Sequence, residues 1–125
     1  MNEVYIMSAT RSPVGAFGGS LKDFDPVYLG AIVAKESIKR SKISPEEIGH
    51  AVFGNVIHTE PRDMYVSRVI SLNSGLNKDS CALTVNRLCG SGLQAIVSAS
   101  QLILLGDTEI ALAGGVEVMS SGTHV

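Results

Sequence analysis

The chain has 125 residues, of which 45% are hydrophobic and 18% are charged, and its formal net charge is −2 at pH 7. A chain of this length and composition can bury the core of one domain, so it is not a disordered segment, and its scattered lysines and arginines form no basic stripe for nucleic acid. Because no apolar run reaches the length of a membrane span and the N-terminus lacks a secretory signal, we expect a cytoplasmic protein with neither membrane nor nucleic-acid partners.

The first half of the chain predicts a strand, a helix and a second strand in turn. Val4–Met7 is rich in β-forming residues and precedes a glycine-rich loop that extends to Gly19. A helix is predicted to begin at Pro26, because Asp25 can cap it and proline is favoured at the first helical position. Its predicted apolar face contains Leu29, Ile32, Val33 and Ile38. Residues 44–47 (SPEE) then fit a capping box before a strand at residues 51–54.

The second half repeats this alternation. Residues 61–72 predict a helix that ends at Asn73-Ser74-Gly75, and residues 82–85 predict a third strand. The next helix follows Cys89 and ends at Gly106, since glycine is the usual C-cap residue. Residues 109–113 predict a fourth strand. The inner face of the helix after Cys89 is predicted to contain Leu93, Ile96, Val97, Ser100 and Leu104.

The predicted strands are almost continuously apolar and alternate with helices. This pattern predicts an α/β fold with a mostly parallel sheet covered by helices on both faces. Ligands bind beyond the carboxyl ends of the strands in such sheets, and we expect Cys89, Gly114, Gly115 and Glu117 to lie there. We expect residues 1–119 to form an N-terminal domain and residues 120–125 to begin a loop region. Because no helix follows to cover the sheet, we expect this domain to be incomplete.

Cys89 lies where the third strand is predicted to turn into a helix. A helix start offers backbone N–H groups without intrahelical partners and the positive end of the helix dipole, and both favour a thiolate over a thiol. Gly90 and Gly92 permit a sharp turn and leave space for a bulky substrate. These features indicate a catalytic nucleophile. The alternative is a small buried hydrophobic residue, which is the common environment of a free cysteine.

A dinucleotide site is a second interpretation of the same region. Residues 90–95 (GSGLQA) fit the pattern G-x-G-x-x-[G/A], and Glu117 follows at about the distance at which an acidic residue binds the ribose. That pattern normally occupies the first strand-to-helix turn, whereas here a strand, a helix, a strand and a further helix precede it. Residues 9–19, at the first turn of this chain, lack the required glycine spacing.

Other reactive or charged residues have structural interpretations. Cys81 directly precedes the third strand and is predicted to be structural, because the two cysteines match neither a metal-binding spacing nor a disulfide framework. Glu117 is predicted to make buried hydrogen bonds rather than to transfer protons. Arg11 and Arg87 could pair with phosphate, but we expect them to bond backbone carbonyls or a carboxylate. Three widely separated histidines are predicted to be surface or loop residues: His50, His58 and His124.

Residues 85–95 (VNRLCGSGLQA), followed by Gly106-Asp107 and residues 113–120 (AGGVEVMS), are similar to the nucleophile region of the thiolases, the acetyl-CoA acetyltransferases and β-ketothiolases. Residues 3–6, 9–15, 17–21 and 53–56 also resemble that family. The resemblance covers nearly the whole chain except its last residues, because residues 121–124 (SGTH) depart from the family's usual continuation. It implies a thiolase-like fold, of which the chain would hold the N-terminal half.

The resemblance implies a two-step transfer of acyl groups between coenzyme A thioesters. Cys89 would be the catalytic nucleophile that carries the acyl group as a thioester, with its backbone N–H as a candidate oxyanion donor. The acyl-CoA substrates would be the only small-molecule partners, with no cofactor or metal besides them. The complete protein would be a homodimer or homotetramer.

The resemblance also implies that essential groups lie outside these residues. The family's activating histidine, second cysteine and asparagine belong to a C-terminal half, so the chain alone is expected to be inactive. The loop at residues 58–64 (HTEPRDM) replaces the glycine, glutamine and asparagine that are commoner in the family, and it resembles one bacterial β-ketothiolase branch. The alternative is a thiolase-fold piece without turnover, either structural or binding acyl-CoA.

Overall fold

A three-stranded parallel sheet organises the computed structural model, which describes residues 3–123. The strands are β1 (His50–Gly54), β2 (Cys81–Val85) and β3 (Ala111–Gly115), and their order in the sheet is β2-β1-β3. His50 lies opposite both Cys81 and Ala111, so the three strands begin together and also end together. The expectation of an α/β fold with a parallel sheet is therefore confirmed.

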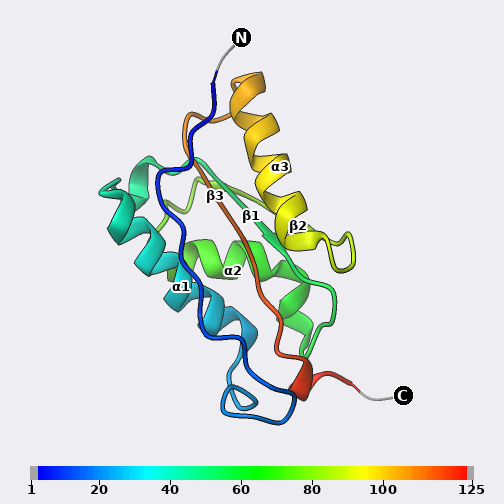
Figure 1. The fold of residues 1–125 in the computed structure, drawn as a ribbon. Helices are drawn as coiled ribbons and strands as arrows, with labels where there is room; N and C mark the ends of the chain where they lie inside the picture. Colours follow the sequence, from blue (N-terminus) through cyan, green and yellow to red (C-terminus); the bar gives the residue numbers. More distant parts are fainter. Residues whose placement is uncertain (1–2, 124–125) are drawn as a thin grey trace.

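Helices cover both faces of this sheet (Figure 1). The two helices α1 (Pro26–Ser41) and α2 (Val66–Asn73) pack against each other on one face, and α3 (Ser91–Leu105) lies on the other. Three short 3-10 helices complete the described elements: η1 (Pro45–Glu47), η2 (Pro61–Tyr65) and η3 (Met119–Ser121). The helix expected over residues 61–72 thus begins as a 3-10 turn and continues as α2.

Local sequence signals fix where α1 and α3 begin or end. The Asp25 Oδ1 atom accepts hydrogen bonds from the N–H groups of Val27 (2.8 Å) and Tyr28 (3.4 Å), which satisfies two unpaired donors at the start of α1. The other carboxylate oxygen of Asp25 pairs with Arg62, from η2. Gly106 ends α3 in the left-handed region, at φ +82°. The Asp25 N-cap and the Gly106 C-cap both agree with the sequence-based prediction.

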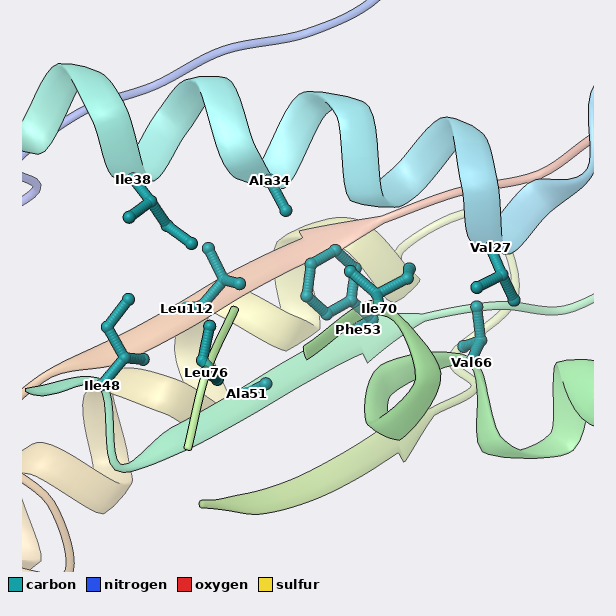
Figure 2. Packing of buried hydrophobic residues seen from close by; sticks show 10 residues of the cluster. All are labelled: Val27, Ala34, Ile38, Ile48, Ala51, Phe53, Val66, Ile70, Leu76 and Leu112. Carbon is teal, nitrogen blue, oxygen red and sulfur yellow. The ribbon is translucent and has the colours of Figure 1, made fainter. Parts of the chain in front are cut away.

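The larger hydrophobic core lies between the sheet and the α1–α2 pair. Figure 2 shows ten of its residues, with side chains from both helices directed toward β1 and β3. Along β1, Ala51 and Phe53 join this core, whereas Val52 joins a smaller cluster beneath α3. This alternation is the two-residue period of a strand, and it divides the core of the protein into two layers.

The N-terminal segment differs from its prediction, because Val4–Met7 is not a strand. The segment runs beside α1 instead, where the hydroxyl of Ser8 donates to the Ser37 carbonyl (2.8 Å) and that of Thr10 to the Val33 carbonyl (3.1 Å). Within residues 3–123 no strand pairs with it, so its β-forming side chains, which include Ile6, stay exposed. The last strand also differs slightly, since β3 begins at Ala111 rather than Glu109.

The buried face of α3 is not the face that the sequence predicts. Ala95 is completely buried and Ala99 nearly so, both against Val52 of β1, whereas Leu93 is 70% exposed. Small side chains let the helix axis lie close to the strands, so they occupy the contact. The large side chains consequently point outward, and those predicted to be internal but found exposed are Leu93, Ile96, Val97 and Leu104.

The helix α3 and the three residues before it form one long apolar stretch. The stretch Leu88–Leu105 has 18 residues and a mean hydropathy of 1.6, which is long and apolar enough to cross a membrane. The expectation that no run reaches this length is therefore wrong. A single such stretch is weak evidence for a membrane span, because core helices of soluble proteins meet the same criterion. Here one face of α3 already packs on β1 and β3.

We predict opposite effects of alanine at two glycines near the start of α3. A Cβ on Gly54 would lie 2.7 Å from the carbonyl carbon of Ser91, so Gly54→Ala should lower the free energy of unfolding by about 1–3 kcal/mol. Gly92→Ala is the matched control, because a Cβ there meets open space and alanine favours a helix by up to about 1 kcal/mol. Denaturant unfolding of the complete protein measures both, and equal midpoints would contradict the close helix–sheet contact.

Candidate functional site

Cys89 lies in the loop that connects β2 to α3, at the carboxyl edge of the sheet. The strand ends at Val85, the helix begins at Ser91, and Gly90 occupies the N-cap position between them. The side chain of Cys89 is exposed. The prediction that this cysteine sits at a strand-to-helix turn is therefore confirmed, and the interpretation of a buried hydrophobic residue is wrong for the described structure.

A tight turn presents the thiol. Leu88 has a φ of +49°, in the left-handed region that residues with a Cβ rarely adopt, and its N–H donates to Asn86 Oδ1 at 3.0 Å. The N–H of Gly90 donates to the Arg87 carbonyl (3.0 Å), and the N–H of Ser91 to the Leu88 carbonyl (3.0 Å). These bonds reverse the chain just before the helix and place Cys89 at the outside of the turn.

The side chain of Ser91 hydrogen-bonds to the backbone on the inner side of the same turn. Its side chain is only 5% exposed, and its hydroxyl accepts a hydrogen bond from the Arg87 N–H at 2.8 Å while donating to the Leu88 carbonyl at 2.7 Å. The sequence-based prediction gave a role to Gly90 and Gly92 but none to Ser91. A serine at the first position of a helix, near an N-cap, is the signal that could have identified it.

The backbone around Cys89 supplies hydrogen-bond donors as well as position. Within residues 3–123 the N–H of Cys89 donates to no protein acceptor, so it is available to an oxygen of a bound substrate. The positive end of the α3 helix dipole also favours negative charge at this position. A thiol beside an unpaired N–H at a helix start can attack a carbonyl carbon while the N–H binds the oxygen that becomes negative.

Polar side chains tie together the segments that leave β1 and β3. Glu117 Oε1 accepts hydrogen bonds from the N–H groups of Val56 (2.8 Å) and Ile57, and Asn55 Nδ2 donates to the Val116 carbonyl at 2.9 Å. Glu117 thus makes the predicted hydrogen bonds, although the residue is half-buried rather than buried. One oxygen of this carboxylate is held by backbone donors that follow β1, which is a structural role rather than the ribose contact of a dinucleotide site.

The structure keeps the other cysteine and one histidine away from Cys89. Cys81 and His50 face each other at the amino ends of β2 and β1, the edge of the sheet opposite to Cys89. Cys81 is exposed rather than packed in the core. His58 lies in the loop before η2, and His124 is outside the described residues. Thus neither Cys81 nor His50 is placed as a base for Cys89.

The two arginines considered for phosphate binding have local partners. Arg11 donates to the Ser12 carbonyl at 3.2 Å, as predicted, and Arg87 donates to Gln94 Oε1 at 2.5 Å, which is a side-chain amide rather than a backbone carbonyl or a carboxylate. A hollow of about 430 Å³ beside the latter pair is lined by Arg87, Gly90, Leu93, Gln94 and Val97. Among residues 3–123 no three His, Cys, Asp or Glu side chains are grouped to hold a metal ion.

The sequence matches one family model over residues 4–125, that of the thiolase N-terminal domain. The chain is 57% identical over 123 residues to the β-ketothiolase BktB of Cupriavidus necator and 43% identical over 123 residues to an acetyl-CoA acetyltransferase of Syntrophomonas wolfei. Each alignment covers 98% of this chain but 31% of the relative. The chain therefore spans about a third of the length of the curated relatives it matches.

Solved structures show the same relationship. The fold is similar to that of human mitochondrial 3-ketoacyl-CoA thiolase in complex with CoA, with a TM-score of 0.91 and 41% identity over 94% of this chain and 30% of the other. It is also similar to the Bacillus anthracis acetyl-CoA acetyltransferase, with a TM-score of 0.90 and 39% identity over 96% of this chain and 30% of that one.

We predict that Cys89 is alkylated before Cys81 in the folded complete protein. Both thiols are exposed, so access alone would give similar rates, but only Cys89 lies at a helix start. A short pulse of iodoacetamide followed by peptide mapping measures the two rates, and unfolded protein, in which they should converge, is the control. Equal labelling in the folded protein, or faster labelling of Cys81, would contradict an activated thiol.

Proposed function

The chain belongs to the thiolase family, of which it holds the N-terminal domain, and from this membership we propose that the complete protein transfers acyl groups between coenzyme A thioesters through Cys89. The observation that carries the proposal is the exposed thiol on the turn before α3. The proposal includes the substrates, because the human relative was solved in complex with CoA.

The first step forms an acyl-enzyme. The Cys89 sulfur attacks the carbonyl carbon of an acyl-CoA, and a tetrahedral intermediate forms with the negative charge on the former carbonyl oxygen. When this intermediate collapses, the carbon–sulfur bond to coenzyme A breaks, and the proton lost by Cys89 ends on the coenzyme A thiol. One thioester thus replaces another, without oxidation or reduction.

Two features of the described loop support this step. The N–H of Cys89, which has no acceptor within residues 3–123, can donate to the oxyanion, and the α3 dipole stabilises the negative charge further. Because these groups are held in place before the reaction, they need not reorganise when the charge develops.

The second step uses the acyl-enzyme in either direction. In synthesis a carbanion from a second acyl-CoA attacks the carbonyl carbon of the Cys89 thioester, and in thiolysis the thiol sulfur of free coenzyme A attacks it. In both cases the carbon–sulfur bond to Cys89 then breaks, which releases a 3-ketoacyl-CoA or a shortened acyl-CoA and restores the Cys89 thiol. The groups that remove the proton from the thiol and from the second substrate belong, by the family resemblance, to sequence beyond this third of the protein. We propose the β-ketothiolase branch, because the loop at residues 58–64 resembles it and the identity to BktB is 57%.

The exposed surfaces also fit a larger protein. The outward side chains of α3, which include Leu93 and Val97, are apolar, and β2 is an edge strand that begins with three exposed residues. Apolar helix faces and unpaired strand edges normally pack against other protein. We propose that the remainder of the protein and a second subunit cover them, within a homodimer or homotetramer.

We predict that Cys89→Ser abolishes acyl-enzyme formation in the complete protein while the fold is kept. A serine hydroxyl is a far weaker nucleophile than a thiolate, so the covalent step should fail. Incubation with radiolabelled acetyl-CoA followed by acid precipitation measures the bound acetyl group, and Cys81→Ser is the matched control that should retain it. Label retained by Cys89→Ser would exclude Cys89 as the acylated residue.

We also predict that these 125 residues alone neither turn over acetoacetyl-CoA nor stay monomeric. Turnover should fail because the family resemblance assigns the groups that take the protons to sequence beyond these residues, and association should follow from the exposed apolar face of α3. The absorbance of acetoacetyl-CoA during thiolysis and light scattering of the purified chain measure the two properties. Cys89-dependent turnover from a stable monomer would refute both expectations and the interpretation of an incomplete domain.

A further inference from the structure

We propose that Ser91 is a positioning residue for the Cys89 nucleophile: its buried hydroxyl locks the turn that aims the thiol at the substrate carbonyl. This inference rests on the proposed function, because it assigns a residue to the acylation step. The Ser91 hydroxyl bonds the backbone of Arg87 and Leu88 and not the thiol, so Ser91 acts through the backbone of the turn.

The two hydrogen bonds of the Ser91 hydroxyl join both residues that precede Cys89. The hydroxyl accepts from the Arg87 N–H (2.8 Å) and donates to the Leu88 carbonyl (2.7 Å), and both distances lie within the normal range for bonds of their types. The Leu88 carbonyl also accepts from the Ser91 N–H at 3.0 Å. One residue therefore holds the Leu88 carbonyl by its backbone and its side chain together.

These hydrogen bonds hold Leu88 in a strained backbone conformation. Leu88 has a φ of +49°, a conformation that is unfavourable for a residue with a Cβ and persists only where surrounding contacts impose it. Apart from the Leu88 N–H bond to Asn86, the contacts described for this turn come from Arg87, Gly90 and Ser91. Without the hydroxyl, the peptide between Leu88 and Cys89 could rotate toward an ordinary conformation and turn the thiol away.

Ser91 is itself fixed against the sheet. It is 5% exposed, and Gly54 at the end of β1 approaches it so closely that a Cβ on that glycine would lie 2.7 Å from the Ser91 Cβ. The central strand thus supports Ser91, whose hydroxyl holds the Arg87–Leu88 side of the turn. Positioning groups act in this way, because they are locked by packing while they orient a neighbour.

The test compares the acylation rate with the chemical reactivity of the same thiol. We expect Ser91→Ala to lower the maximal rate of Cys89 acylation by saturating acetyl-CoA about 10- to 100-fold, since small misplacements of a reacting group cost that much. Alkylation of Cys89 by iodoacetamide, a small reagent that approaches from any direction, should change less than about threefold. Rapid-quench mass spectrometry of the complete protein measures both rates at a temperature below its unfolding transition.

Ser100→Ala is the matched control. Ser100 lies on the same helix and its hydroxyl also bonds a backbone carbonyl, that of Ile96 at 2.8 Å, but it is remote from the turn. Both rates should therefore equal those of the unaltered protein. Acylation of Ser91→Ala at the unaltered rate would overturn the inference. An equal fall in the acylation and alkylation rates would also overturn it, because Ser91 would then affect the reactivity of the thiol rather than its orientation.

A second variant covers the case in which Ser91→Ala does not fold. Ser91→Cys keeps the shape of the side chain but replaces two short hydrogen bonds with long, weak ones, so it should lower acylation in the same direction. Fragment spectra distinguish acylation at residue 89 from residue 91, and unaltered acylation at Cys89 would overturn the inference. The proposed function fails separately, if the unaltered protein forms no acyl group on Cys89 at all.

Discussion

The close approach of α3 to the sheet is the constraint on which the rest of this structure depends. Small residues make it possible: a Cβ on Gly54 would overlap Ser91, and one on Gly115 would lie 3.2 Å from the Cα of Gly92. Further along, Ala95 and Ala99 rest on Val52. Because Cys89 precedes the helix by two residues, this packing also fixes the place of the thiol above the carboxyl ends of the strands.

The same contact explains the unusual surface of α3. A helix that meets its sheet through alanine and glycine must direct its larger side chains elsewhere, and Leu93 and Val97 consequently point outward. On a complete small domain such a face would be costly, since apolar surface gains free energy when it leaves water. The chain spans about a third of the length of its relatives, and the larger protein proposed above would cover this face.

Polar contacts at the carboxyl edge have a different effect from the apolar packing beneath them. Three side chains bind backbone groups of the loops that follow the strands: Glu117, Asn55 and Ser91. These hydrogen bonds fix loops that have no regular secondary structure of their own. Backbone donors that lose water normally need such partners. The N–H of Cys89 has no such partner within residues 3–123, and chemistry at a carbonyl needs a donor that the fold has not already used.

The sequence by itself determined the features that depend on a few neighbouring residues. Asp25 and Pro26 start α1, Gly106 ends α3, apolar runs mark the three strands, and Cys89 falls between β2 and α3. Tertiary structure alone decided the strand order, the placement of Val4–Met7 beside α1 and the buried face of α3. Caps and turns are local, so short patterns specify them. Which face of an almost wholly apolar helix is buried depends instead on how closely its neighbours approach, and periodicity along one segment carries no information about that distance.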